Sequence, residues 1–166
     1  MAKCPDEMPS TDIRDAGMGV NSERKTILVV DDDPDALELK CELLKQCGCD
    51  VLRAPDGESA LALLRDNDRI DLLYTDTNMP GPNGFEVARR AREQIPDLKV
   101  LFSSGNPAYE NLKLSDRLLM VPFGLQEFVD AVAAALGTSA GGPEHLRLTD
   151  TLQQMLQKRK RAPQPA

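Results

Sequence analysis

The chain contains no tryptophan, a single histidine, and an aromatic content of only 4%. It has no hydrophobic run near the roughly 18 residues that a membrane-spanning helix needs, so we expect no membrane insertion. The first 25 residues include no apolar block of the kind found in signal peptides. We therefore expect a cytoplasmic protein. The one histidine, His145, lies outside the main pattern of strands and helices, so a histidine-centred catalytic site is not expected there.

Cysteine is also scarce, and the chain has no glycine-rich loop after its first apolar run. The four cysteines match no usual zinc spacing, and in a cytosolic protein they are expected to be reduced thiols: Cys4, Cys41, Cys47 and Cys49. We expect Cys41 to be buried on a helix face. Without a glycine-rich phosphate loop, binding of a dinucleotide or a nucleoside triphosphate is not expected.

The charge is negative overall and unevenly distributed. The net charge is −7, but residues 26–137 carry 20 acidic and 11 basic side chains, whereas residues 138–166 carry two acidic and five basic ones. An acidic body argues against general affinity for nucleic acid. The basic stretch at 158–161 fits a solvated last turn of a helix, where positive charge complements the helix dipole.

Residues 26–137 alternate short apolar runs with helical periods, and residues 1–25 before them have the composition of a flexible arm. Such alternation predicts a doubly wound α/β fold, (βα)5, with a flavodoxin-like parallel sheet in the order 2-1-3-4-5. The predicted strands are Thr26–Asp31, Asp50–Ala54, Asp71–Thr75, Lys99–Ser103 and Leu118–Val121. The predicted helices begin at Pro34, after Asp56, at Asn83 and at Leu125, with a weaker one near 108–114.

Residues 138–166 are predicted to be a linker followed by an extra C-terminal helix over 144–161. Four apolar residues share one face of that helix: Leu148, Leu152, Met155 and Leu156. An isolated helix of this length is marginal in water, so the stripe needs a surface to pack on. Three alternatives stay open: the helix packs on its own domain, it packs on a second subunit in a homodimer, or it is only transiently ordered.

Carboxylates follow two of the predicted strands directly. Asp31, Asp32 and Asp33 come after the run Ile27–Val30, and Asp76 comes after the run from Leu72. Parallel strands end at one edge of the sheet, so these side chains are expected to meet there. Crowded carboxylates suit Mg²⁺, and a carboxylate beside Mg²⁺ is a possible nucleophile toward a phosphoryl group. Asp33 is expected to cap the following helix instead.

These residues resemble the receiver domain of two-component response regulators. The resemblance rests on Val29-Val30-Asp31-Asp32, on Asp76 followed by Met79-Pro80-Gly81, on Ser104 before Gly105, and on Val121-Pro122-Phe123. It implies that Asp76 accepts a phosphoryl group from a histidine kinase. It implies an Mg²⁺ site formed by Asp31, Asp32, Asp76 and the backbone carbonyl of Asn78, and it makes Ser104 the switch hydroxyl that binds the phosphoryl group.

Two positions depart from the family's pattern. Val121 stands where the family has a lysine, and Leu118 stands where it has a switch aromatic. We expect the site to lack this fixed cation, so that Mg²⁺ is the only positive charge beside the acceptor. One interpretation is a working receiver that has drifted. The alternative is a pseudo-receiver, an interaction or dimerisation module with weak or no phospho-switching.

The sequence predicts no enzymatic turnover beyond the domain's own phosphorylation and dephosphorylation. The pair Asp31 and Asp33 also fits haloacid-dehalogenase-type phosphatases, but Asp35 stands where that family needs Thr or Val, and no lysine lies near a later strand end. Only 29 residues follow the predicted receiver domain. We therefore expect a stand-alone regulator with no DNA-binding output domain, which signals to a downstream protein through direct contacts.

Overall fold

The structure is a computed structural model that describes residues 24–105, 112 and 116–137. Three predictions lie almost wholly outside these residues. They concern the N-terminal arm over 1–25, the weak helix near 108–114, and the linker and helix over 138–166.

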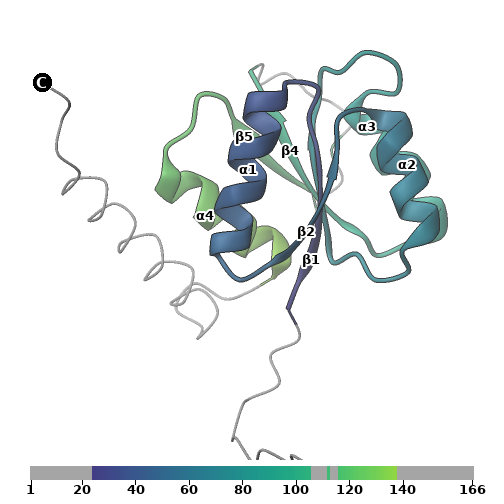
Figure 1. Cartoon of the computed structure of the whole chain (residues 1–166), viewed down its shortest axis with the longest axis horizontal. Helices are drawn as coiled ribbons and strands as arrows, with labels where there is room; N and C mark the ends of the chain where they lie inside the picture. The colour runs from purple at the N-terminus through teal and green to yellow at the C-terminus, as the bar shows by residue number, and fades with distance from the viewer. Residues whose placement is uncertain (1–23, 106–111, 113–115, 138–166) are drawn as a thin grey trace, which may run out of the picture.

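Five parallel strands form one sheet in the order β2-β1-β3-β4-β5 (Figure 1). The strands are β1 (Thr26–Val30), β2 (Asp50–Ala54), β3 (Leu72–Asp76), β4 (Lys99–Ser104) and β5 (Arg117–Met120). The predicted fold class and strand order are confirmed. β1 and β3 are neighbours in register, with Val30 opposite Thr75, so the acidic residues after these strands start from adjacent positions.

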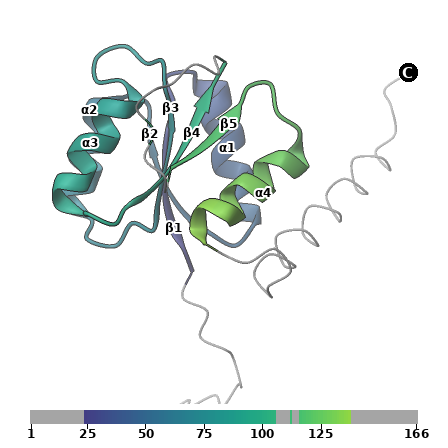
Figure 2. The ribbon, with the colours of Figure 1, turned by 180° about the vertical axis from the view of Figure 1, so that it is seen from behind.

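In the part of the chain that the structure describes, four helices cover the two faces of the sheet. They are α1 (Pro34–Gln46), α2 (Gly57–Asp66), α3 (Gly84–Gln94) and α4 (Leu125–Leu136). Figures 1 and 2 show α1 and α4 on one face and α2 and α3 on the other. No helix in the described part of the chain is both long and apolar enough to cross a membrane.

Short polar residues start α1, α2 and α3. Asp33 accepts hydrogen bonds from the backbone N–H groups of Asp35 and Ala36 and so caps α1, whose first residue is a proline. Asp56 caps α2 in the same way through Ser59 N–H, and Asn83 caps α3 through Glu86 N–H. The predicted roles of Asp33 and Asp56 as caps are confirmed. As a result, each helix begins close to the carboxyl edge of the sheet.

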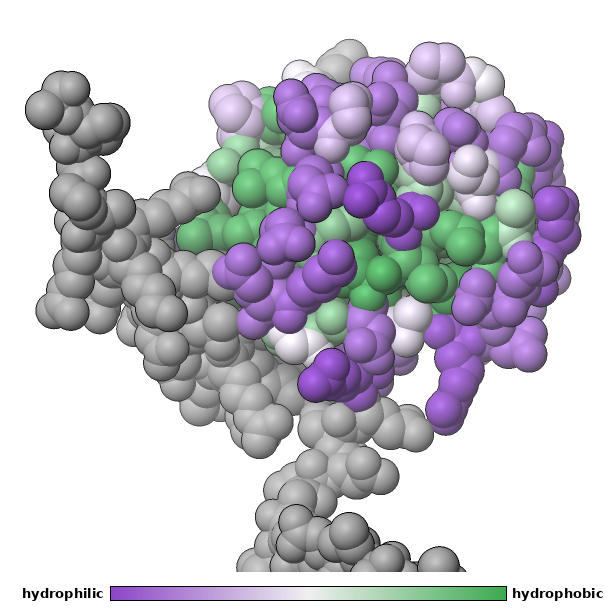
Figure 3. All heavy atoms as spheres, in the orientation of Figure 1, coloured by the Kyte–Doolittle hydropathy of each residue, from purple (hydrophilic) through white to green (hydrophobic). Residues whose placement is uncertain are grey.

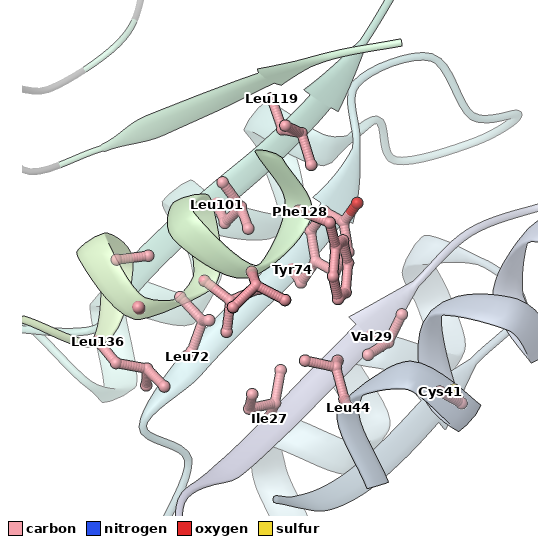
Figure 4. Packing of buried hydrophobic residues seen from close by; sticks show 14 of the residues in the cluster. Ile27, Val29, Cys41, Leu44, Leu72, Tyr74, Leu101, Leu119, Phe128 and Leu136 are labelled. Carbon is pink, nitrogen blue, oxygen red and sulfur yellow. The ribbon is translucent and has the colours of Figure 1, made fainter. Parts of the chain in front are cut away.

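Side chains alternate along the strands and divide the core into two layers. Ile27 and Val29 of β1 pack with α1 and α4, whereas Leu28 and Val30 pack with α2 and α3. Figure 4 shows the first layer, in which Tyr74 of β3 lies against Phe128 of α4 with ring centroids 5.8 Å apart. The central strands are buried on both faces, so the carboxyl edge is where they leave polar groups accessible.

Candidate functional site

Three carboxylates converge at the carboxyl edge of the sheet, as the sequence predicts. Ligand oxygens of Asp31, Asp32 and Asp76 all lie within 4.8 Å of one another. Asp31 is buried, Asp32 is exposed and Asp76 is partly buried. The group opens on a cleft of about 340 Å³, whose lining also includes Asn78 and Val121.

Backbone groups hold two of these carboxylates in place. Asp31 accepts a hydrogen bond from the N–H of Asp33 at 3.0 Å, and Asp76 accepts one from the N–H of Thr77 at 2.8 Å. The start of α3 presses on the same strand end, because a Cβ at Gly84 would lie 2.2 Å from the carbonyl oxygen of Asp76. Both the side chain and the backbone of Asp76 are therefore fixed by their surroundings.

The pKa of Asp76 is raised above its ordinary value. Burial is the largest cause and the charge of Asp31 the second, whereas the N–H of Thr77 and the charge of Lys40 act in the opposite direction. Like charges this close disfavour ionisation unless a cation lies among them. A positive charge near these carboxylates would therefore stabilise their ionised forms.

A lysine from α1 supplies part of that charge, which the sequence analysis missed. The Nζ atom of Lys40 donates to Asp31 Oδ2 at 2.5 Å and to Ser103 Oγ at 3.1 Å. It lies 4.8 Å from the centroid of the Tyr74 ring. The side chain is only 8% exposed. The expectation that no fixed cation stands beside the acceptor is therefore wrong: the cation comes from α1.

One signal in the sequence could have revealed Lys40. The apolar face of α1 contains Leu37, Cys41 and Leu44, all buried as predicted, and Lys40 lies on that face because it is three residues after Leu37 and four before Leu44. A buried lysine needs a carboxylate partner. A lysine on the inner face of the helix that follows an acidic cluster was a reason to look for that pairing.

The two departures from the family's pattern lie in β5 and directly after it. Val121 is 46% exposed and lines the cleft, and its peptide bond to Pro122 is cis. Leu118 is partly buried and packs against the α2/α3 layer. Neither position offers a charge or a ring to the carboxylates.

Two serines end β4, and the structure gives them different surroundings. Ser103 pairs in register with Asp76, lines the cleft and accepts from Lys40. Ser104 is buried, and its carbonyl oxygen accepts from the N–H of Val121 at 2.8 Å. Ser104 is the predicted switch hydroxyl, and that role stays a prediction.

The sequence profile of the response regulator receiver domain matches residues 27–119. The chain belongs to this family, whose domains act in two-component signalling. It is 35% identical over 117 residues to the response regulator receiver protein CpdR of Brucella abortus, a match that covers 68% of this chain and 97% of CpdR. Several other curated relatives are longer proteins, and the chain spans half of their length or less.

Solved receiver structures show the same fold. A response regulator receiver protein from Sinorhizobium medicae superposes with a TM-score of 0.64 at 31% identity, covering 69% of this chain and 96% of that one. The response regulator TrrA from Thermotoga maritima, solved in complex with Mg²⁺ and BeF, superposes with a TM-score of 0.60 at 32% identity. That match covers 67% of this chain and 98% of TrrA.

The residues present fit a magnesium ion. Three carboxylates within 4.8 Å of one another form an all-oxygen donor set, which is what a hard divalent cation prefers. Asp32 is exposed, so water can complete the coordination. The donor set is of the kind that Mg²⁺ uses in phosphoryl chemistry.

Proposed function

We propose that this chain accepts a phosphoryl group from a histidine kinase on Asp76, with Mg²⁺ bound by Asp31, Asp32, Asp76 and the carbonyl of Asn78. The observation that supports this proposal is the convergence of the three carboxylates at the mouth of an open cleft. In the transfer, the bond between phosphorus and the kinase's imidazole nitrogen breaks, and a bond from phosphorus to a carboxylate oxygen of Asp76 forms. The imidazole nitrogen keeps the electron pair. The metal, when bound, offsets negative charge on the phosphoryl oxygens.

The rest of the site orients the acceptor. The N–H of Thr77 holds one carboxylate oxygen of Asp76. The Ser104 hydroxyl is proposed to bind the phosphoryl group, as it does in the family. Output is proposed to pass through protein contacts, and the rim of the cleft offers an apolar surface for them. Leu39 is 53% exposed and Val121 46% exposed there. Figure 3, which views the molecule with both helix layers in sight, shows hydrophobic residues exposed among hydrophilic ones.

A small phosphodonor tests the acceptor directly. Incubation with acetyl phosphate and Mg²⁺ should add the mass of one phosphoryl group to the intact chain. Asp76→Asn should abolish that addition, because an amide cannot serve as the anionic nucleophile. Asp35→Asn is the matched control, since Asp35 is exposed on the first turn of α1 and has no part in the carboxylate cluster. Labelling that persists in Asp76→Asn would move the acceptor to another carboxylate.

The alternative is a pseudo-receiver that binds partners without a phosphorylation-driven change of shape. Leu118 favours it, because the residue lies against the α2/α3 layer and has no ring to move between two positions. Beryllofluoride with Mg²⁺ separates the two functions. A receiver that switches changes its amide spectrum well beyond the cleft, whereas a pseudo-receiver changes only around Asp76 or not at all.

The C-terminal stripe is proposed to hold a homodimer through residues 144–161. Four buried apolar residues of this kind contribute about 1.5–3 kcal/mol each, enough for a two-fold interface. Gly137 ends α4 in a left-handed conformation, so a chain cut after it keeps the whole described domain. Loss of the dimer in that shortened chain supports the proposal, and an unchanged size contradicts it.

A further inference from the structure

Lys40 contributes a buried ammonium to the cleft that Asp76 also lines. Lys40, Asp76, Ser103 and Val121 line one cleft. An ammonium has three N–H donors, and among the described residues Asp31 and Ser103 accept two of them. We propose that Lys40 binds the phosphoryl group formed on Asp76 and thereby supplies from α1 the positive charge that Val121 cannot supply. This inference rests on the proposed function and names a further residue for it.

The charges of the cluster favour such a role. Three carboxylates and one ammonium leave two negative charges, which one divalent cation balances. A phosphoryl group brings about −2 in place of the single charge of Asp76. With the metal bound, the phosphorylated site then holds one excess negative charge if Lys40 is present and two if it is absent. A fixed cation in a partly buried site therefore stabilises the product of transfer.

Lys40 also has an opposing effect before transfer. Its ion pair with Asp31 occupies an oxygen of one of the metal-binding carboxylates, and its charge repels a divalent cation. Removing Lys40 should therefore tighten Mg²⁺ binding and weaken binding of the phosphoryl group. These two effects have opposite signs. A lysine that served folding alone would loosen the whole site and weaken both.

Lys40→Met removes the charge while keeping the apolar part of the side chain. Lys45→Met is the control, since Lys45 lies on the same helix but is exposed beside Glu42. For Lys40→Met we expect Mg²⁺ to bind roughly tenfold more tightly, because a nearby unit charge no longer repels the divalent ion. Calorimetric or amide-shift titration with Mg²⁺ alone measures this. Beryllofluoride binding and acetyl-phosphate labelling should fall about 10²–10³-fold. Lys45→Met should match the wild type in all of them.

Moving the positive charge from position 40 to position 121 tests whether the site needs a cation or Lys40 in particular. Val121 lines the same cleft, so Lys40→Met/Val121→Lys returns a cation to the site from the residue that follows β5. We expect the double variant to recover most of the beryllofluoride affinity and labelling rate lost in Lys40→Met. If Lys40→Met does not fold, Lys40→Gln serves, because its amide still donates to Asp31 while the charge is gone. The same two opposite shifts are expected for it.

Two results overturn the inference. One is unchanged beryllofluoride affinity in a folded Lys40→Met or Lys40→Gln protein. The other is a parallel loss of Mg²⁺ and beryllofluoride binding, which makes Lys40 structural only. A wild-type chain that neither becomes labelled nor binds beryllofluoride overturns the proposed function and the phosphoryl role together. In that case Mg²⁺ affinity still decides whether Lys40 competes with a cation for Asp31.

Discussion

On the α2/α3 side of the sheet, a cluster of apolar side chains lies next to the site, and the site is held by close contact between backbones. A Cβ at Gly57 would lie 2.4 Å from the carbonyl oxygen of Pro82, and one at Gly84 would lie 2.2 Å from that of Asp76. On the α1/α4 side, the core beside the site contains a buried ion pair between Asp31 and Lys40. The acceptor is therefore positioned sterically from one side and electrostatically from the other.

The two kinds of support differ in how well they tolerate substitution. A steric support depends on the absence of side-chain atoms, so almost any substitution damages it. An electrostatic support depends on a charge within reach, and that charge can come from another element. The cation beside the carboxylates of this receiver comes from α1, and the position after β5 carries Val121.

Breaking the charge pair should produce the largest change in stability. Lys40→Met leaves Asp31 buried without its partner, and loss of one member of a buried pair typically costs about 3–5 kcal/mol. Asp31→Asn/Lys40→Met removes both charges and should cost clearly less. Urea unfolding of both variants without Mg²⁺ measures the difference. Equal losses in the single and double variants would mean that the pair contributes packing and not charge.

The next largest loss of stability should come from adding a methyl group at Gly84. Gly84→Ala places a methyl group against the carbonyl of Asp76, and forcing an atom into a packed core costs about 1–3 kcal/mol. We expect the upper part of that range, because the neighbour is backbone and cannot rotate away. Gly105→Ala is the control, since its Cβ would meet nothing within 4 Å. Thermal melting should show a large loss for the first variant and little change for the second.

Much of the fold follows from local sequence signals. The bounds of β2 and α4 match the prediction, because turn residues flank Asp50–Ala54 and a glycine lies on each side of Leu125–Leu136. β1 was predicted to include Asp31 but ends at Val30, since the chain turns there into the Asp33 cap of α1. Where a strand stops depends on the first hydrogen bonds of the following helix, and periodicity does not reveal these.

The site was predictable in its acids but not in its cation. Asp31, Asp32 and Asp76 follow strands whose ends must meet, so sequence order fixes their proximity. Lys40 lies nine residues after Asp31 on another element, and only the packing of α1 on β1 and β3 brings the two together. The contacts at Gly57 and Gly84 are likewise tertiary, because they depend on how closely two loops approach.

A smaller change in stability should show whether Asp76 acts on the fold through its charge or through its packing. Burial and Asp31 raise the pKa of Asp76, so the folded state holds that proton more strongly than the unfolded chain does. The protonated carboxyl of Asp76 therefore contributes stability at low pH. This stability is lost as the pH rises from 3.8, the ordinary pKa of the group, through the raised pKa of the folded state. Without Mg²⁺, Asp76→Asn should therefore be more stable than the wild type at neutral pH, by less than the loss in Gly84→Ala.

The pH dependence provides the check on this gain. The advantage of Asp76→Asn should shrink as the pH falls toward 3.8, where the wild-type carboxyl takes up its proton. Added Mg²⁺ should reverse it at neutral pH, because the carboxylate of Asp76 binds the ion more tightly than an amide at that position does. An advantage that stays constant from neutral to acidic pH would show that Asn packs better and that charge is not the cause.

The smallest change in stability is expected at Tyr74, whose ring and hydroxyl have different surroundings on the α1/α4 side. The ring packs against Phe128 and lies under the ammonium of Lys40. The hydroxyl is buried near Ser103 but makes no well-formed hydrogen bond to a residue in the described part of the chain. A buried donor without a partner destabilises the folded state, so Tyr74→Phe should be neutral or stabilising by up to about 1 kcal/mol.

Tyr74→Leu, which removes the ring as well, should destabilise the protein and weaken the contact that positions Lys40. If Tyr74→Phe instead costs as much as Tyr74→Leu, the hydroxyl has a partner that matters, and the electrostatic support of the site extends deeper into the core than Asp31, Lys40 and Ser103.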